Sequence, residues 1–450
     1  MNSIIRRIYV FLFLLCAAPS FAFAAGEQQL KSTLEFVYAN NPELQAKREE
    51  LKAVDEGVAQ AISGFRPSVS AALSKGRARS GDVAQTWNYG NTKMRSLDIE
   101  QPIFSGGGSV ASFKAAKDRV KAARAELSAL EQQVLYNAIV AYTDIVEKKS
   151  VLELSQKTVD VLTKQLEASN ARFEVGVITA TDVAQSKARL AQAQAQERQA
   201  LGDLEIAKAD FKRVVGYDAP DGLELPEIPA GIPENLALAN EIATSNSPIL
   251  EAARQSENAA KNNIFVSGSA ILPSVSLQGT MSRGDGVSNS INSFDSDAIK
   301  LNLNIPLYQS GAEWSRLREA RNQAQQAKFN SMDTSAAVAQ SVSSAWEGLA
   351  TATAIIKSNE EAAKAAQAAL DGVQKENEFG TRTVLDVLNA EQENFIAQVN
   401  LIKARRAEKT SAYRLLATIG KLTSSDLQLN SNVPNPKEHY NSVKYQLIGL

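Results

Sequence analysis

Apolar residues recur every three or four positions along most of the chain, which is the spacing of one face of an α-helix. Leu127, Leu130 and Val134 follow this rule, and the same stripe returns between Val159 and Phe173. No proline interrupts the chain from Gly107 to Phe173, so the pattern predicts a single helix of roughly 100 Å. A stripe this narrow is typical of a coiled coil rather than of a compact globular domain.

A second pattern, strict alternation of apolar and polar residues, interrupts the helical stretches. It is clearest where Leu301, Leu303 and Ile305 alternate with polar residues, and it returns in 69–73, 97–100 and 275–277. Alternation predicts strands with one apolar and one polar face, which suits either a soluble sheet or a membrane β-barrel. The flanking long helices and an export signal favour the membrane. We expect four strands per chain, too few to close a barrel, so the chain must oligomerise.

The chain consists of two similar halves. Pro42 and Pro67 return at one constant interval as Pro248 and Pro273. A second interval, two residues shorter, then relates Pro102, Gly176, Asp182 and Gly216 to Pro306, Gly380, Asp386 and Gly420. Each half reads as helix, two strands, very long helix, turn and helix. The repeat predicts an internally duplicated fold that is mostly α-helical with a small β part.

The segment boundaries follow from this repeat. Arg6 and Arg7, the apolar run that follows them and the motif Ala22-Phe23-Ala24 predict a secretory signal peptide. Cys16 lies inside that apolar run, so the mature chain has no cysteine. We expect a signal peptide at 1–24, a first repeat at 25–217, a linker at 218–233, a second repeat at 234–428 and a loose C-terminal tail at 429–450.

Composition argues against catalysis and against nucleic-acid binding. The formal net charge is −2, so no basic field attracts nucleic acid. His439 is the only histidine, and one isolated histidine makes neither a histidine-based metal site nor a Ser–His relay. Motifs of hydrolases, metalloproteases and nucleotide-binding proteins are absent from the sequence. We therefore predict no enzyme activity, no cofactor, no metal and no nucleic-acid partner.

A paired motif marks the turn after each long helix. Gly176 and Gly380 are suited to end the helices, because glycine adopts the left-handed backbone at a C-terminal cap. The segments 179–182 and 383–386 then read as capping boxes, each with its acid at a helix N-terminus. Each half therefore ends in a helix–turn–helix tip.

These features resemble the TolC family of outer-membrane efflux and secretion channels, over roughly 27–428. The resemblance implies a homotrimer in the cell outer membrane that extends into the periplasm. Each chain would give four strands to a shared transmembrane β-barrel, and the coiled-coil helices would form a periplasmic α-barrel. It further implies an exit duct for proteins or small toxic compounds, with a gate that opens on docking. The implied partners are a periplasmic adaptor protein, an inner-membrane ABC or proton-driven pump, and outer-membrane lipid.

The resemblance also implies roles for tip residues. Asp386 would form a pore constriction with Asn389, which stands where the family often has a second acid. Arg382 would clamp neighbouring tips in the closed state, with Thr181, Asp182 and Gln165 as its partners. A tyrosine of the family pattern is missing near Asn377, which predicts a looser closed state. The tip turns that would dock the adaptor contain Gly176, Val177, Gly380 and Thr381.

Two simpler interpretations stay open at this point. The tip acids act as helix caps whether or not they line a pore, and Arg382 fits equally an exposed surface arginine worth under ~1 kcal/mol. A periplasmic or surface coiled-coil protein, such as a stalk or adhesin, would also explain export and the heptads. It would not explain the paired alternating strands. The cargo, the adaptor and the pump cannot be read from the sequence.

Overall fold

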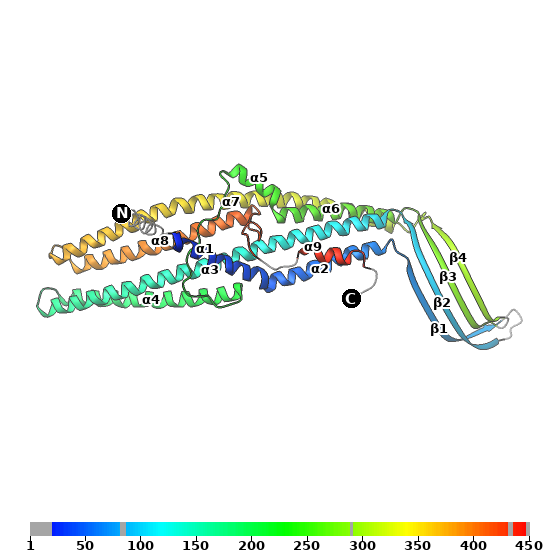
Figure 1. The fold of residues 1–450 in the computed structure, drawn as a ribbon, viewed down its shortest axis with the longest axis horizontal. Coiled ribbons are helices and arrows are strands. Elements are labelled where there is room, and N and C mark those ends of the chain that lie inside the picture. Colours follow the sequence, from blue (N-terminus) through cyan, green and yellow to red (C-terminus); the bar gives the residue numbers. More distant parts are fainter. Residues whose placement is uncertain (1–19, 82–86, 289–290, 431–434, 447–450) are drawn as a thin grey trace, which may run out of the picture. The chain divides into compact units, whose positions relative to one another are not determined.

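The computed structural model describes residues 20–81, 87–288, 291–430 and 435–446. Most of the expected signal peptide lies outside these residues, and the first helix begins at Ser20. The element order is helix–helix–strand–strand–helix–helix, and it occurs twice (Figure 1). In the first half the elements are α1 Ser20–Asn40, α2 Pro42–Ser63, β1 Ser68–Gly81, β2 Trp87–Ser105, α3 Gly108–Glu174 and α4 Ala180–Val215. In the second half they are α5 Leu236–Asn246, α6 Pro248–Ser269, β3 Ser274–Ser288, β4 Ile291–Asn304, α7 Ala312–Glu378 and α8 Val384–Thr418, followed by α9 Pro436–Val443.

The two halves have matching dimensions. Helices α3 and α7 each contain 67 residues, and α4 and α8 contain 36 and 35. At about 1.5 Å per residue each long helix extends about 100 Å, the length expected from the proline-free pattern. Among the helices within the described ranges, none is both long and apolar enough to cross a lipid bilayer.

The chain divides into two compact units. The first comprises residues 1–46, 128–248 and 336–433. Its main core encloses Tyr142, Phe211, Ile139 and Leu415, all fully buried. These large side chains fix the middle of the helical bundle, while a smaller cluster of Leu162, Ala193, Val384 and Leu388 lies near the tip turns. The helices near the tips are thus held by few apolar contacts, which is the usual property of a segment that moves.

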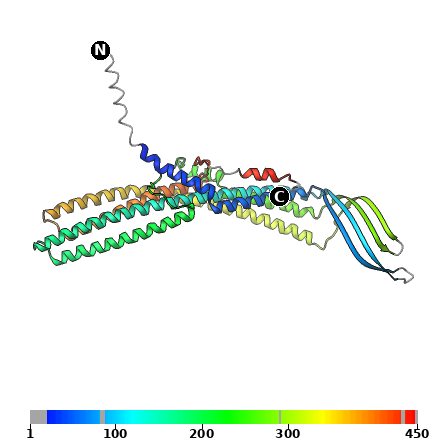
Figure 2. The same cartoon turned by 60° about the horizontal axis from the view of Figure 1, so that its bottom comes forward.

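The second unit comprises residues 47–127, 249–335 and 434–450, and it contains the sheet. Two small clusters stabilise its helices, one of Leu51, Ala123 and Leu127, the other of Val58, Ala116 and Val120. Alanines and valines at these positions allow close approach of the helices. Figure 2 shows the strands continuing from the ends of the helices.

The four strands form one antiparallel sheet in the order β1-β2-β3-β4. Residues directly opposite one another share a face, so the register defines both faces of the sheet. One face carries Val69, Ala71, Leu73, Leu97, Ile99, Val275, Leu277, Met281, Ile299, Leu301 and Leu303. The other carries Ser68, Ser70, Asp98, Glu100, Ser276, Gln278, Thr280, Lys300 and Asn302. The predicted four strands and their two unlike faces are therefore confirmed.

The structure corrects two details of the sequence interpretation. Ile305 lies one residue beyond the end of β4 at Asn304, directly before Pro306, which has no amide hydrogen to continue the ladder. The C-terminal segment, expected to be a loose tail, contains helix α9, which begins at a proline after the capping residue Asn435. Within the described residues, the linker 218–233 holds neither a helix nor a strand.

Candidate functional site

The first feature of the tips is a glycine turn at the end of each long helix. Gly176 and Gly380 adopt φ angles of 77° and 76°, the left-handed region that other residues avoid. The amide of Val177 donates to the carbonyl of Arg172 at 2.9 Å, and the amide of Thr381 donates to that of Glu376 at 3.0 Å. These bonds satisfy the last carbonyls of each helix and reverse the chain direction.

The predicted capping boxes are both present. The Thr179 amide donates to Oδ2 of Asp182 at 2.9 Å, and the Asp182 amide donates to Oγ1 of Thr179 at 3.3 Å. In the second repeat the corresponding bonds between Thr383 and Asp386 are 3.0 and 3.2 Å. Hydrogen bonds from the threonine amide and hydroxyl hold the pKa of each aspartate below its usual value. Both carboxylates are therefore ionised at neutral pH.

Asp386 and Asn389, the expected constriction residues, lie about one turn apart at the start of α8. Asn389 is not free, because its Oδ1 accepts a hydrogen bond from Nη2 of Arg189 at 2.9 Å. Arg189 projects from α4, the equivalent helix of the first repeat. The expected constriction therefore has a cation beside it that the sequence interpretation did not include.

Arg382 pairs inside its own tip turn. Nε of Arg382 donates to Oε2 of Glu376 at 2.8 Å. The backbone carbonyl of Arg382 accepts a hydrogen bond from Nδ2 of Asn377 at 2.9 Å. Of the expected clamp partners, Asp182 caps α4, Thr181 is exposed, and Gln165 lies in α3. None of the contacts recorded in the described part of the chain joins Arg382 to these three residues. A clamp between neighbouring copies stays a prediction.

Two arginine–asparagine hydrogen bonds connect the tips of the two repeats. Nη1 of Arg172 donates to Oδ1 of Asn377 at 2.9 Å, and Arg189 donates to Asn389 as described above. Charged donors make these bonds stronger than neutral ones. Sequence reasoning identified Asn377 only by the missing tyrosine, and it missed both arginines. The only sequence signal for them is their position near the tip motifs, as for Arg172, which lies one turn before Gly176.

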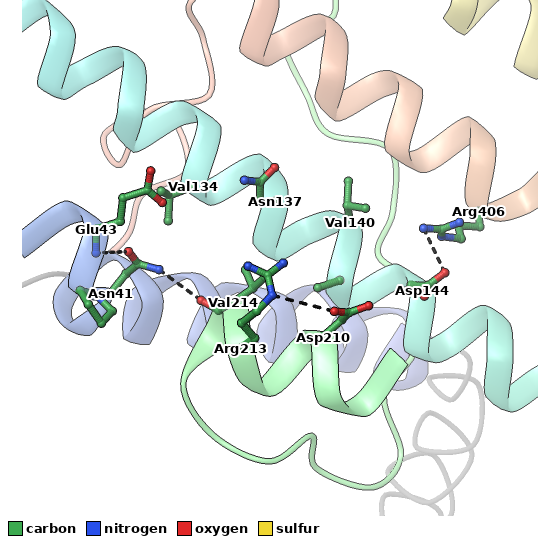
Figure 3. A pocket seen from close by; sticks show the side chains of 12 residues that line it. Asn41, Glu43, Val134, Asn137, Val140, Asp144, Asp210, Arg213, Val214 and Arg406 are labelled. Atoms are coloured by element: carbon green, nitrogen blue, oxygen red, sulfur yellow. Dashed lines mark hydrogen bonds and ion pairs between the residues drawn. The ribbon is translucent and has the colours of Figure 1, made fainter. Parts of the chain in front are cut away.

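A polar cavity of about 560 Å³ lies in the middle of the first unit (Figure 3). Its charged lining includes Asp144 of α3 and Arg406 of α8. Nη2 of Arg406 lies 3.1 Å from Oδ1 of Asp144. Nη1 of Arg406 also contacts Oε2 of Glu147 at 3.2 Å, and Glu147 is only 5% exposed. These ion pairs join the two repeats at mid-helix. Among the residues that the structure describes, no group of three or more His, Cys, Asp and Glu could hold a metal.

Duplicated long helices, capped tip turns and a four-stranded sheet with one apolar face are together the features of an outer-membrane channel subunit. A family model described as outer membrane efflux protein matches residues 34–217 and 240–421, so the chain belongs to that family. It is similar to the outer membrane efflux protein BepC of Brucella suis, with 32% identity over 95% of this chain and 93% of BepC. It is also similar to the outer membrane protein TolC of Escherichia coli, with 24% identity over 92% and 87% of the two chains.

The solved structure of the Campylobacter jejuni CmeC outer membrane channel has the same fold. It superposes with a TM-score of 0.79 at 16% identity, covering 92% of this chain and 89% of that one. The predicted TolC-family membership and fold class are thus confirmed. The chain is an outer-membrane channel subunit that serves as an exit duct, and it resides in the outer membrane and extends into the periplasm. Its family forms transport channels.

Proposed function

We propose that three copies of the chain form one tunnel, with all twelve of their strands closing a single β-barrel. The observation that carries this proposal is the sheet, whose strands β1 and β4 each have one unpaired edge in the described chain. An open edge cannot face lipid, because its backbone donors and acceptors would have no partner. Pairing β1 of one copy with β4 of the next satisfies both edges and places the apolar face outward.

The helical tips form the periplasmic gate of this tunnel. Asp386 and Asn389 line the constriction, and threefold symmetry makes a ring of three carboxylates that favours cations. In the assembled tunnel Arg382 contacts Thr181, Asp182 and Gln165 of the neighbouring copy and clamps the two copies together. These contacts replace its ion pair with Glu376 in the single chain. No catalytic step is needed for this role, because the chain only has to guide and release its cargo.

The exposed tips dock the periplasmic adaptor of a tripartite system, which also contains an ABC or proton-driven pump in the inner membrane. Val177 and Phe379, which flank the two tip glycines, are 69% and 83% exposed. Exposed apolar residues at a turn are suited to a protein contact. The adaptor contacts the turns at Gly176, Val177, Gly380 and Thr381.

Small toxic compounds are the favoured cargo, because the family description and the name of BepC both specify efflux. Protein secretion is the second candidate, since the sheet and tips suit either cargo. Conductance across a planar bilayer tests the duct. The purified protein should give uniform cation-selective steps that rise in Arg382→Ser, whose tips should part, and insertion of both proteins without conductance would rule out the duct. A soluble periplasmic rod would instead support a coiled-coil stalk.

A further inference from the structure

The apolar face of the sheet does not stay apolar along its whole length. Toward the hairpin turns it changes to charged residues, which we call the charged belt. The charged belt consists of Lys75, Arg77, Lys93, Arg95, Arg283, Asp285, Asp295 and Asp297. Lys75 follows Leu73 on the same face of β1, about 7 Å further along the strand. An apolar surface and a charged surface thus meet on one face of the sheet.

Like charges lie directly opposite each other in the charged belt. Lys75 faces Lys93 across β1 and β2, and Arg95 faces Arg283 across β2 and β3. Side chains in such pairs have Cβ atoms about 5 Å apart, and like charges there destabilise the sheet. A sheet keeps such pairs at little cost only where counter-charges are supplied.

Counter-charges are present on β3 and β4 but not on β1. Arg283 contacts Asp295 at 3.4 Å and Asp297 at 3.3 Å, and Arg95 contacts Asp285 at 3.9 Å. For Lys75, Arg77 and Lys93, no ion pair is recorded within the part of the chain that the structure describes. All three are exposed. Asp285 lies opposite Lys93 but contacts Arg95, so the cations of the β1–β2 half of the charged belt outnumber the one anion beside them.

We propose that three cations of this half, Lys75, Arg77 and Lys93, bind the phosphorylated head group of a glycolipid in the outer leaflet. The proposal rests on the proposed function, which places the hairpin turns at the outer surface and the apolar face in lipid. Acyl chains then pack on Leu73, Leu97 and Ile99 while phosphate reaches the three cations. Arginine and lysine both bind phosphate, arginine through its planar fork and lysine as a compact charge.

A second copy of the chain is the competing occupant, because β4 of a neighbour carries Asp295 and Asp297. Two observations favour the lipid. Both aspartates already contact Arg283, and Lys93 lies on β2, one strand further from the neighbour than β1. Strand spacing of about 4.8 Å puts Lys93 roughly 10 Å from such a β4. A neighbour's β4 therefore does not reach Lys93, and the anion opposite Lys93 in its own chain, Asp285, already contacts Arg95.

The test is native mass spectrometry of the full-length protein, purified in uncharged detergent and titrated with lipid A that carries two phosphates. The triple variant Lys75→Gln, Arg77→Gln, Lys93→Gln should bind this lipid about 100-fold more weakly than the wild type, since three cations near the head group are lost. Lys300→Gln is the matched control, because Lys300 lies on the opposite, polar face and should bind normally.

Three further arms separate the explanations. Lipid A without its two phosphates should bind the wild type weakly, with the same affinity that diphosphorylated lipid A has for the triple variant. Inorganic phosphate at the same concentration should not displace diphosphorylated lipid A from the wild type. Equal binding of diphosphorylated lipid A to the triple variant and the wild type overturns the proposal. So does a triple variant that loses assembly instead of lipid, which would assign the cations to the neighbouring copy. Conductance of the same samples shows separately whether the duct itself exists.

Discussion

At the residue scale, the tip acids have a structural role that any gating role must share. Thr179 with Asp182 and Thr383 with Asp386 form reciprocal bonds that satisfy amides at the start of α4 and α8. Because the same carboxylates are partly exposed and charged, they can also act on ions near the tip. The two roles separate experimentally, because Thr383→Ala removes the capping hydroxyl and keeps the charge, whereas Asp386→Asn removes the charge and keeps an oxygen that can accept from the Thr383 amide.

Removal of a cap should loosen one tip. Thr383→Ala should cost about 1 kcal/mol of local stability, the usual value for an N-cap. Hydrogen exchange of the segment around 381–388 measures this loss as faster opening. Thr353→Ala is the control, because Thr353 lies exposed inside α7 and bonds only a carbonyl of its own helix. Equal exchange in both variants would show that the capping box contributes nothing to the tip.

The caps should also respond to acid. The pKa values of Asp182 and Asp386 are lowered in the folded protein, so protons bind the unfolded tip more tightly. Their contribution to stability is complete above the ordinary value of 3.8 and is lost as pH falls through the lowered pKa. Opening rates, corrected for intrinsic exchange, should therefore rise below about pH 4. Rates that rise instead between pH 5 and 7 would assign the transition to other groups.

Gate and filter should separate in bilayer recordings. Arg382→Ser removes a cation from the tip, so neighbouring tips should part and conductance should rise. Asp386→Asn removes the negative charge and keeps an oxygen that can accept from the Thr383 amide, so cation selectivity should fall about severalfold while conductance stays near the wild type. Arg405→Ser is the control, because Arg405 pairs with Glu360 away from the tips. Wild-type conductance in Arg382→Ser, together with wild-type selectivity in Asp386→Asn, would reduce both residues to caps and surface charge.

At the element scale, the two faces of the sheet set what each strand tolerates. The register places Leu303 opposite Val275 on the apolar face and Asn302 opposite Ser276 on the polar face. Neighbouring residues of β4 thus enter different surroundings once the barrel forms. The outward face must accept lipid, whereas the inward face meets the tunnel.

Leu303→Arg should therefore be costly where Asn302→Asp is not. A cation at mid-bilayer on the lipid face costs about 2–4 kcal/mol, so the variant should yield less assembled protein. The matched variant Asn302→Asp adds a charge one residue away on the polar face and should assemble normally. Heat-resistant oligomer in outer-membrane fractions is the readout. Equal yields would mean that β4 faces are assigned the wrong way round.

Helix α9 has its own attachment through the only histidine. Nδ1 of His439 lies 3.3 Å from Oδ2 of Asp55, which is fully buried, and Arg124 lies 3.7 Å from the other carboxylate oxygen. Burial raises the pKa of Asp55, while the His439 hydrogen bond and Arg124 oppose this shift. His439→Ala should release α9 and cost about 1–3 kcal/mol, because Asp55 loses a partner. Protease cleavage within 435–446 measures this, and Lys437→Ala, an exposed neighbour, should cut like the wild type.

At the scale of the whole molecule, the sequence patterns predicted the architecture more completely than they predicted the contacts between side chains. Duplication, helix length, strand number and caps are all encoded locally, by prolines, glycines and periodicity. The full length of β1 was not visible, because its alternation ends where Lys75 and Arg77 replace apolar residues. The bonds of Arg172 and Arg189 to asparagines also escaped prediction. They join residues about two hundred positions apart, and only the folded chain brings these together.

The number of chains in one particle tests the central claim most directly. Four strands per chain, two open sheet edges and one apolar face require copies of the chain to complete one another. The mass of the protein extracted from outer membranes in mild detergent should be three times that of one mature chain. A monodisperse single chain with its sheet intact would contradict the shared barrel, and with it the tunnel.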